Sequence, residues 1–335
     1  MKAWRFIRGL GLENLECIEL PDPRPGPGQA VVRVRACSLN YRDLVVSRGG
    51  YGRGVKAPLT PLSDGAGEVL AVGEGVTRVK PGDRVAAIFM QGWLDGPPDD
   101  AKVATALGGA LDGMLAEQVC LDAAGLVHFP LHLSFQEAAA LPCAAVTAWQ
   151  SLLVSGGLRP GQSVLVQGTG GVSIFALQFA KMAGARVIAT SSSDSKLDRL
   201  RAMGADTLVN YRTTPDWDRQ AREFTGGAGV DHVIEVGGAG TLPLSLKAVR
   251  RGGHIALIGV LAGSGEIDPR FIFLKQARIQ GIYVGSRQMF EDMNQALAAS
   301  GMRPVVDRVF AFDEVLAAMA YLESGAHFGK VCIGL

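Results

Sequence analysis

Five consecutive residues form a glycine-rich turn between an apolar stretch and a helical pattern: Gly168, Thr169, Gly170, Gly171 and Val172. A glycine at position 168 permits a tight turn, and a glycine at position 170 lets backbone approach a pyrophosphate closely. The helix that follows offers free N–H groups and a partial positive charge at its start. The spacing therefore predicts a dinucleotide site, although Ser173 stands where the fingerprint has its third glycine, and similar turns are purely structural in some proteins.

The next strand pattern, ARVIATS, ends at Ser191, and Ser192 and Lys196 follow it. NAD-binding folds usually place an acid at the first of these positions, where it binds the ribose 2′-hydroxyl. Without that acid, hydroxyl and ammonium groups are free to donate to a 2′-phosphate. We therefore predict NADP(H) rather than NAD(H) as the cofactor. The alternative is a solvated serine-rich turn with little cofactor preference.

The stretch LPCAAVTAW places Cys143 in an apolar run. A nucleophilic cysteine needs a base or a cation close to the thiol, and no His, Lys or Arg occurs between Glu137 and Arg159. The five cysteines of the chain are far apart and show no CxxC spacing, which argues against disulfides and zinc knuckles. Cys143 is therefore expected to be a small packing residue that lines a pocket.

These residues must be positioned by two kinds of domain. Short strand patterns such as QAVVRVRACSL and GDRVAAIF, separated by turns, predict a barrel-like β unit at the N-terminus. Ser134 and Glu137 have the spacing of a capping box and predict the start of a helix. From about residue 163, strands and helices alternate, which is typical of a doubly wound parallel sheet. The expected domains are residues 1–128, residues 129–273 and a return segment, 274–335.

Composition excludes several partners. The chain has 335 residues, 48% of them apolar, with 33 Lys and Arg against 32 Asp and Glu. A charge so close to neutral does not attract nucleic acid. We see no signal pattern and no run of 18 apolar residues, so we expect a cytoplasmic protein that does not enter a membrane.

Seven motifs spread over the chain carry a family resemblance: NYRDL, DGAGEVLAVGEGV, KPGDRV, AAALPCAAVTAW, the glycine-rich turn, GVDHVIEVGG and GKVCIGL. With these motifs the chain resembles the medium-chain dehydrogenase/reductase superfamily, and most of all its zinc-independent quinone oxidoreductases and enone reductases. The resemblance implies an α/β protein in which a GroES-like β-barrel domain is interrupted by a Rossmann domain. It also implies an active site in the cleft between the two domains.

Zinc-dependent members of this superfamily hold a catalytic metal at three positions. Aligned by motif, these positions carry Asn40, Ser63 followed by Asp64, and Cys143 in this chain. Zinc would be held poorly by this set of ligands, which consists of an amide, a hydroxyl or carboxylate, and one thiolate. Residues 86–119 also lack the cysteines of the structural zinc lobe. The resemblance therefore implies an enzyme without zinc.

Hydrogen-bond donors suffice for hydride transfer to an enone or quinone, because the product is an enolate or phenolate. The resemblance assigns the catalytic donors to Asn40 and Tyr41. The alternatives are that Asn40 caps a turn and Tyr41 packs in the barrel wall, while Asp43 matches an acid that is usually structural. Two other functions stay open: a zinc-free alcohol or aldehyde dehydrogenase, and a non-enzymatic NADPH-binding sensor or crystallin-like protein.

The resemblance also implies roles for further residues, some of them within these motifs. Residues expected near the cofactor, besides the turn and Ser191, are Thr147, Tyr211, Gly237, Gly259, Val260, Val284, Gly285 and Ser286. Residues expected to line a substrate pocket are Asp64, Met90, Trp93 and Cys143, although Met90 and Trp93 suit buried packing equally well. A homodimer is expected through an apolar edge strand, residues 278–285, which lacks the Lys or Pro that would protect it.

Overall fold

The computed structural model describes residues 1–50, 55, 58–259, 261 and 265–335. The chain divides into two compact units, a β-rich unit (residues 1–146 and 284–335) and an α/β unit (147–283). The sequence pattern changes earlier than this, at about residue 128 and again at about 273. Within the described ranges, no helix is long and apolar enough to cross a membrane.

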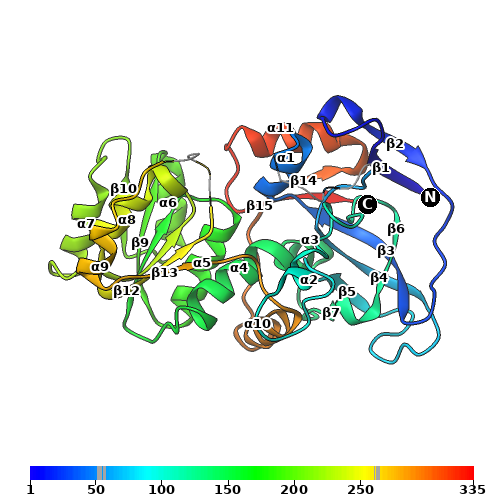
Figure 1. Ribbon diagram of the computed structural model, residues 1–335, viewed down its shortest axis with the longest axis horizontal. Helices are drawn as coiled ribbons and strands as arrows, with labels where there is room; N and C mark the ends of the chain where they lie inside the picture. Colours follow the sequence, from blue (N-terminus) through cyan, green and yellow to red (C-terminus); the bar gives the residue numbers. More distant parts are fainter. Residues whose placement is uncertain (51–54, 56–57, 260, 262–264) are drawn as a thin grey trace. The chain divides into compact units, whose positions relative to one another are not determined.

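Strands of the β-rich unit form a seven-stranded sheet and a separate two-stranded one (Figure 1). The large sheet has the order β14-β15-β3-β4-β5-β7, and β6 pairs with β3. Its strands are β3 (Gln29–Ser38), β4 (Asp64–Val72), β5 (Arg84–Ala87), β6 (Gln118–Asp122), β7 (Leu126–His128), β14 (Val306–Ala311) and β15 (Lys330–Gly334). The small sheet joins β1 (Lys2–Phe6) to β2 (Leu15–Glu19). This is the GroES-like domain that the sequence predicts.

Register in the large sheet brings three chain segments together. Ser38, the last residue of β3, pairs with Asp64 at the start of β4 and with Cys332 of β15. Because β15 runs antiparallel to β3, Lys330 then lies opposite position 40, just beyond the end of β3. Residues nearly 300 apart in sequence therefore meet at one end of the sheet.

Helices of the β-rich unit include α1 (Tyr41–Ser47), α2 (Asp100–Val103), α3 (Phe135–Ala139), α10 (Arg287–Ser300) and α11 (Val315–Glu323). The predicted capping box is present, because Ser134 Oγ accepts the N–H of Glu137 and the Glu137 carboxylate accepts the N–H of Ser134. Short 3₁₀ turns span Leu12–Asn14, Ala123–Gly125 and Phe312–Glu314 in this unit, and Gly238–Gly240 in the α/β unit.

The helix expected after Ser134 is irregular. Two π-helical turns, Leu141–Ala145 and Gln150–Val154, flank the short helix α4 (Val146–Trp149). Pro142 lies in the first π-helical turn and has no N–H to contribute. The widened turn leaves the next N–H, that of Cys143, to donate outside the helix. Such turns in helices are frequent at functional sites.

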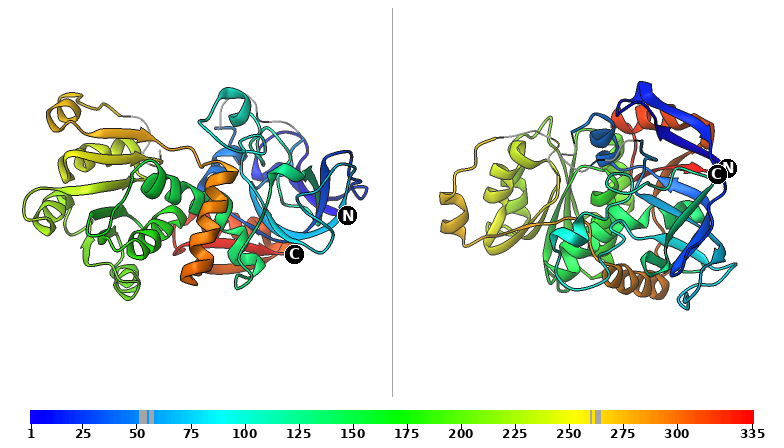
Figure 2. Two further views of the ribbon diagram at one scale, coloured as in Figure 1. Left: turned by 90° about the horizontal axis from the view of Figure 1, so that it is seen from below. Right: turned by 45° about the vertical axis from the view of Figure 1, so that its right-hand side comes forward.

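A six-stranded parallel sheet forms the centre of the α/β unit, with the order β10-β9-β8-β11-β12-β13 (Figure 2). This is the strand order of the Rossmann fold. The strands are β8 (Ser163–Gln167), β9 (Arg186–Ser191), β10 (Thr207–Asn210), β11 (Val230–Glu235), β12 (Val249–Leu257) and β13 (Arg278–Gly281). The helices are α5 (Gly171–Met182), α6 (Asp194–Ala202), α7 (Trp217–Phe224), α8 (Leu242–Ala248) and α9 (Arg270–Lys275).

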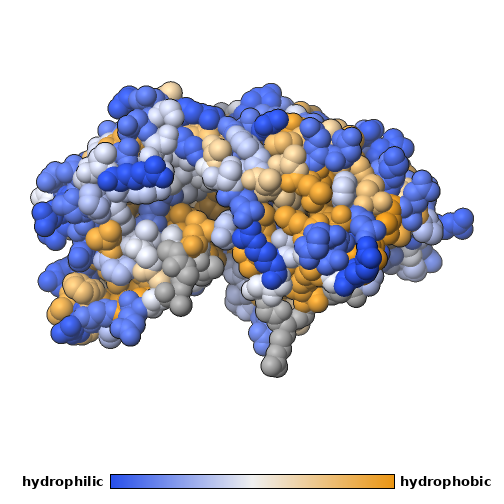
Figure 3. Space-filling model, turned by 90° about the horizontal axis from the view of Figure 1, so that it is seen from above, coloured by the Kyte–Doolittle hydropathy of each residue, from blue (hydrophilic) through white to orange (hydrophobic). Residues whose placement is uncertain are grey.

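Burial in this sheet follows its topology. Every residue of β8 is buried, as expected for a central strand covered on both faces. Polar and apolar side chains mix on the surface (Figure 3), and α9 exposes Phe271, Phe273 and Leu274. β13 is an edge strand of the sheet, as the sequence suggests for residues 278–285.

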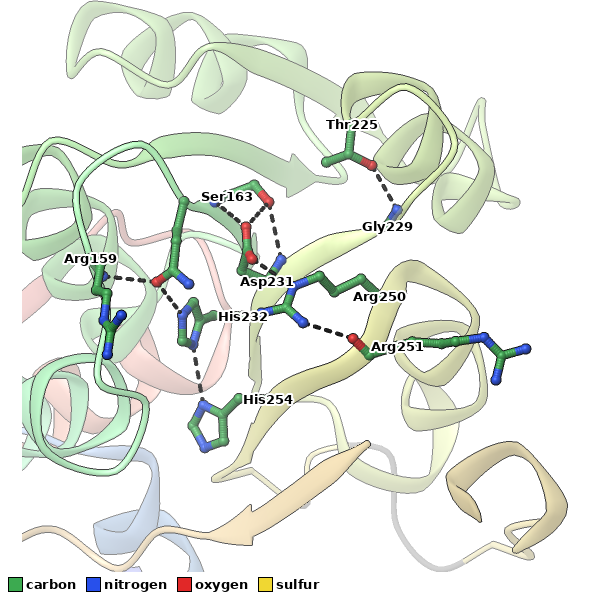
Figure 4. A network of polar contacts seen from close by, with 10 residues as sticks. Arg159, Ser163, Thr225, Gly229, Asp231, His232, Arg250, Arg251 and His254 are labelled. Atoms are coloured by element: carbon green, nitrogen blue, oxygen red, sulfur yellow. Dashed lines mark hydrogen bonds and ion pairs between the residues drawn. The ribbon is translucent and has the colours of Figure 1, made fainter. Parts of the chain in front are cut away.

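Two buried histidines face each other on neighbouring strands β11 and β12 (Figure 4). Gln162 Oε1 accepts the N–H of Arg159 and lies 3.1 Å from His232 Nε2, so this nitrogen carries a proton. His232 Nδ1 is then an acceptor, and His254 Nδ1, 3.4 Å away, is its donor. His254 Nε2 is buried without a partner among the residues described. This pattern makes His232 neutral, and the burial of His254 Nε2 without such a partner disfavours a charge on His254.

We expect these histidines to make the protein sensitive to acid. Burial lowers the pKa of each imidazole to about 4; Asp231 opposes this for His232, while Arg250 and Arg278 reinforce it. The unfolded chain binds protons near pH 6.5, so stability is full above that pH and is lost as pH falls towards 4. The loss should be about 2–3 kcal/mol per imidazole at pH 4.5, measured by urea unfolding.

His254→Asn is the informative variant, because its amide is still able to donate to His232. The free energy of unfolding of this variant should change less between pH 7 and pH 4.5 than that of the parent. Burial raises the pKa of Asp43 to about 6, which favours folding as pH falls. This opposite contribution is common to both proteins and cancels in the comparison. Identical pH profiles for parent and variant would contradict the assignment.

Candidate active site

The glycine-rich turn lies at the carboxyl end of β8, directly before α5. Gly168 has a φ of 71°, in the left-handed region that favours glycine. A Cβ on Gly170 would meet nothing within 4 Å, so the backbone there is open to a ligand. Ser173 Oγ donates to the carbonyl of Gln167 at 2.6 Å and is buried, which explains a serine in place of the third glycine. This cradle and the 12-residue helix behind it fit a dinucleotide pyrophosphate.

The other predicted cofactor residues of this unit follow the carboxyl ends of neighbouring strands. Ser191 ends β9, Tyr211 follows β10, Gly237 follows β11 and Gly259 follows β12. Parallel strands place these ends at one edge of the sheet, where ligands bind in such folds. The N–H of Tyr211 donates to the carbonyl of Ser191 at 3.1 Å, so the second and third strand ends are in contact.

Side chains near the end of β9 are partly engaged with each other. Ser191 is buried, and its Oγ accepts the N–H of Ser193 at 3.2 Å. Ser192 and Lys196 are half-buried, while Tyr211 is 42% exposed. Asp194 accepts from Asn210 Nδ2 at 2.7 Å, and it begins α6 rather than occupying the strand end.

A buried carboxylate that sequence reasoning missed joins two of these strand ends. Glu235, the last residue of β11, accepts Gln167 Nε2 at 2.9 Å, which ties it to the end of β8. It also accepts the N–H groups of Gly237 and Gly238, at 2.9 and 3.0 Å, and the hydroxyls of Thr241 and Ser245. The carboxylate therefore fixes the loop after β11. The sequence signal for Glu235 was an acidic residue at the end of an apolar strand pattern, in VIEVGG.

In the β-rich unit, Asn40 and Lys330 form a buried pair at the end of β3. Lys330 is 3% exposed, and its Nζ lies 2.6 Å from both Asn40 Oδ1 and the carbonyl of Leu39. Asn40 is 8% exposed, and its Nδ2 is buried without a hydrogen-bond partner among the residues described. The Asp64 carboxyl lies beside this amide, and its interaction with the Asn40 side chain lowers the pKa of Asp64 against the effect of burial. Lys330 was not singled out from the sequence.

Asp64 links three segments around this pair. Its carboxylate accepts Ser63 Oγ at 2.7 Å and the N–H of Cys143, freed by the π-helical turn, at 3.1 Å. Burial raises the pKa of Asp64, while the charge of Lys330 opposes the rise. Burial also raises the pKa of the Cys143 thiol well above its usual range, and Asp64 adds to that effect. Cys143 is therefore a thiol that packs, not a thiolate.

Arg42 and Asp43 form a charged pair next to Asn40. Asp43 accepts the N–H of Asn40 at 2.7 Å and so holds the start of α1. Arg42 pairs with Asp43 at 3.4 Å, donates to the carbonyl of Leu107 at 3.0 Å and stacks over Phe89. This network agrees with a structural role for Asp43. Tyr41, by contrast, is 46% exposed at the first position of α1.

The remaining predicted residues are more scattered. Met90 and Trp93 are fully buried, and the Trp93 indole donates to the carbonyl of Gly96. Ser286 caps α10, while Gly285 leaves no room for a Cβ against Val146. Val284 has a φ of 59°, a strained conformation for a β-branched residue. Thr147 lies buried in α4, and Val260 lies outside the described residues.

A GroES-like β unit and a Rossmann sheet with a dinucleotide cradle define an oxidoreductase that uses NAD(P)H. Residues 26–131 match the family described as alcohol dehydrogenase GroES-like domain, and residues 171–299 match zinc-binding dehydrogenase. The chain belongs to the medium-chain dehydrogenase/reductase superfamily.

Individual relatives cover almost the whole chain. A zinc-type alcohol dehydrogenase-like protein of Schizosaccharomyces pombe is 46% identical over 96% of both chains. The acryloyl-coenzyme A reductase of Metallosphaera sedula is 30% identical, also over 96% of both. A solved structure from Sinorhizobium meliloti 1021, assigned as an alcohol dehydrogenase, has a TM-score of 0.94 at 45% identity and covers 100% of this chain and 98% of its own.

Proposed function

We propose that this protein reduces an activated C=C bond or a quinone with NADPH and without a metal. The observation that carries the proposal is the buried, unpartnered Nδ2 donor of Asn40, at a position where zinc-dependent relatives have a ligand. An acryloyl-coenzyme A reductase among the relatives supports reduction of a C=C bond. We propose that Ser191, Ser192 and Lys196 favour the 2′-phosphate, and that the protein acts in the cytoplasm.

Zinc does not fit the donor set. A catalytic zinc site needs three protein ligands and an open position. The aligned positions supply the amide of Asn40, the hydroxyl of Ser63 beside the Asp64 carboxyl, and a thiol with a raised pKa. Lys330 already donates to Asn40 Oδ1, and an ammonium next to a ligand atom opposes a second cation. No set of three metal-ligating side chains is found in the parts of the chain that the structure describes.

The glycine cradle would hold the pyrophosphate, and Glu235 fixes the adjoining loop. When bound, NADPH supplies a hydride that forms a C–H bond at the β carbon of the substrate. The C=C electron pair would then form a new double bond to the carbonyl carbon while the C=O π pair moves onto oxygen. A proton from water would complete the product at the α carbon as the C=O bond forms again. Asn40 Nδ2 donates to that oxygen as its charge grows, and Tyr41 supplies a second donor from an exposed position.

The proposal is tested by NADPH oxidation against a panel of enones, enals, quinones, ketones and aldehydes, together with the zinc content of the purified protein. We expect turnover of enones or quinones, unchanged in chelator, with far less than one zinc per chain. Turnover restricted to alcohols and aldehydes would favour a dehydrogenase. Tight NADPH binding with no turnover would favour a sensor.

Replacing Cys143 by alanine should leave kcat within about three-fold of the parent, because a half-buried thiol with a raised pKa neither attacks nor coordinates. Stability should fall by about 1 kcal/mol through the small cavity. Steady-state kinetics and thermal unfolding check both values. Collapse of turnover with the fold intact, or stoichiometric zinc in the parent, would overturn the metal-free mechanism.

We also propose that two copies pair through β13, whose outer edge has no partner strand among the residues described. Exposed apolar side chains on the neighbouring α9 would be covered in such a dimer. Light scattering that gives a monomer at micromolar concentration would rule it out.

A further inference from the structure

A buried ammonium is expensive unless charges and hydrogen bonds compensate it. Lys330 begins β15, and its 3% exposure leaves almost no contact with water. Two acceptors, the carbonyl of Leu39 and Asn40 Oδ1, take two of its three protons. Burial raises the pKa of the fully buried Asp64 and the charge of Lys330 opposes that rise, so a carboxylate there compensates the ammonium. This end of the sheet is therefore built to hold one cation.

The cation and the position of Asn40 as the N-cap of α1 together determine which way its amide faces. An ammonium has donors and no acceptor, so only Oδ1 of the amide is able to point towards it. The Nδ2 group is thereby directed away from Lys330; it has no hydrogen-bond partner among the residues described, although the Asp64 carboxyl lies near this amide. An unsatisfied buried donor costs about 1–3 kcal/mol. An acceptor atom of a ligand would recover that cost.

We propose that Lys330 is the positioning residue of this site: it holds the Asn40 amide so that Nδ2 donates to the substrate oxygen that gains negative charge, and it takes the role of resident cation at the position of the family's metal. The inference rests on the proposed metal-free reductase and adds a residue to it. Lys330 acts through Asn40. Its positive charge polarises the amide and makes Nδ2 a better donor, as hydrogen bonds in series do at low dielectric.

A double-mutant cycle with Lys330→Met and Asn40→Ala tests this directly. Lys330→Met should lower kcat about 10- to 100-fold, which is the loss of one charge-assisted hydrogen bond, and leave the KM for NADPH within about three-fold. In the Asn40→Ala background the same change should cost less than about three-fold, because its target is gone. Multiplicative losses, or an unchanged kcat in Lys330→Met, would overturn the proposal.

Two further variants keep the test decisive. Removing Lys330 alone leaves the Asp64 carboxylate uncompensated and threatens the fold. If the single variant does not fold, the double variant Lys330→Met/Asp64→Asn takes its place. The double variant should show the same loss of kcat. Lys275 also donates to two backbone carbonyls, those of Lys247 and Val249, but in the other unit. Lys275→Met should lower thermal stability without changing kcat.

Failure of this inference differs visibly from failure of the proposed function. A parent protein that turns over no enone or quinone, or that contains stoichiometric zinc, refutes the function before any variant is compared. An active, zinc-free parent whose Lys330 and Asn40 variants lose activity independently refutes only the positioning role.

Discussion

Asn40→Asp should lower kcat by about 100- to 1000-fold, the usual cost of removing one preorganised donor to a developing oxyanion. The substitution keeps the shape of the side chain and gives Lys330 a charged acceptor in place of Oδ1, which lies 2.6 Å away. It removes the Nδ2 donor and places a negative charge near the oxygen that becomes anionic. The rate of NADPH oxidation with the best substrate of the panel, at saturating cofactor, gives kcat for both proteins.

Stability separates the catalytic role of Asn40 from a structural one. The new carboxylate pairs with Lys330, so we expect thermal unfolding within a few degrees of the parent. Asn14→Asp is a matched control, since Asn14 lies partly exposed and donates to the carbonyl of Leu10. It should leave kcat unchanged. A destabilised Asn40→Asp protein with full turnover would mean that the amide only supports the turn before α1.

The sequence was sufficient to predict the architecture because its signals are local. Glycine positions, strand alternation and the Ser134 capping box each depend on neighbours within a few residues. They predicted a doubly wound parallel sheet and the cradle after β8. The π-helical turn before α4 was not predicted, because the acceptor of its Cys143 N–H is distant: it is Asp64, 79 residues earlier. Helical periodicity carries no information on such a partner.

The same reason explains which site residues were missed. Asn40 and Cys143 belong to motifs that show their place directly, but Lys330 matters only through a strand register that pairs β15 with β3. Glu235 likewise matters because β11 lies beside β8 and brings Gln167 within reach. Both could have been flagged by one physical signal. Each is a charged residue at the end of an otherwise buried strand, where its charge must have a partner.

Ser191→Asp should reverse the cofactor preference. We expect the parent to bind NADPH about 10- to 100-fold more tightly than NADH, through charge-assisted contacts to the 2′-phosphate. Aspartate at the end of β9 would accept from a ribose 2′-hydroxyl and repel a 2′-phosphate. It would also keep the local turn, because a carboxylate is able to accept the Ser193 N–H that Ser191 Oγ now accepts. Dissociation constants from nicotinamide fluorescence give both affinities.

Two comparisons make this result specific to the 2′-phosphate. Lys196→Met should weaken NADPH while leaving NADH unchanged, since it removes positive charge without adding an acceptor for the ribose. The NADH affinity of each variant also reports whether the glycine cradle is intact, because the pyrophosphate is common to both cofactors. If the parent binds the two cofactors equally, Ser191 and its neighbours form a solvated turn, and selectivity must come from another part of the α/β unit.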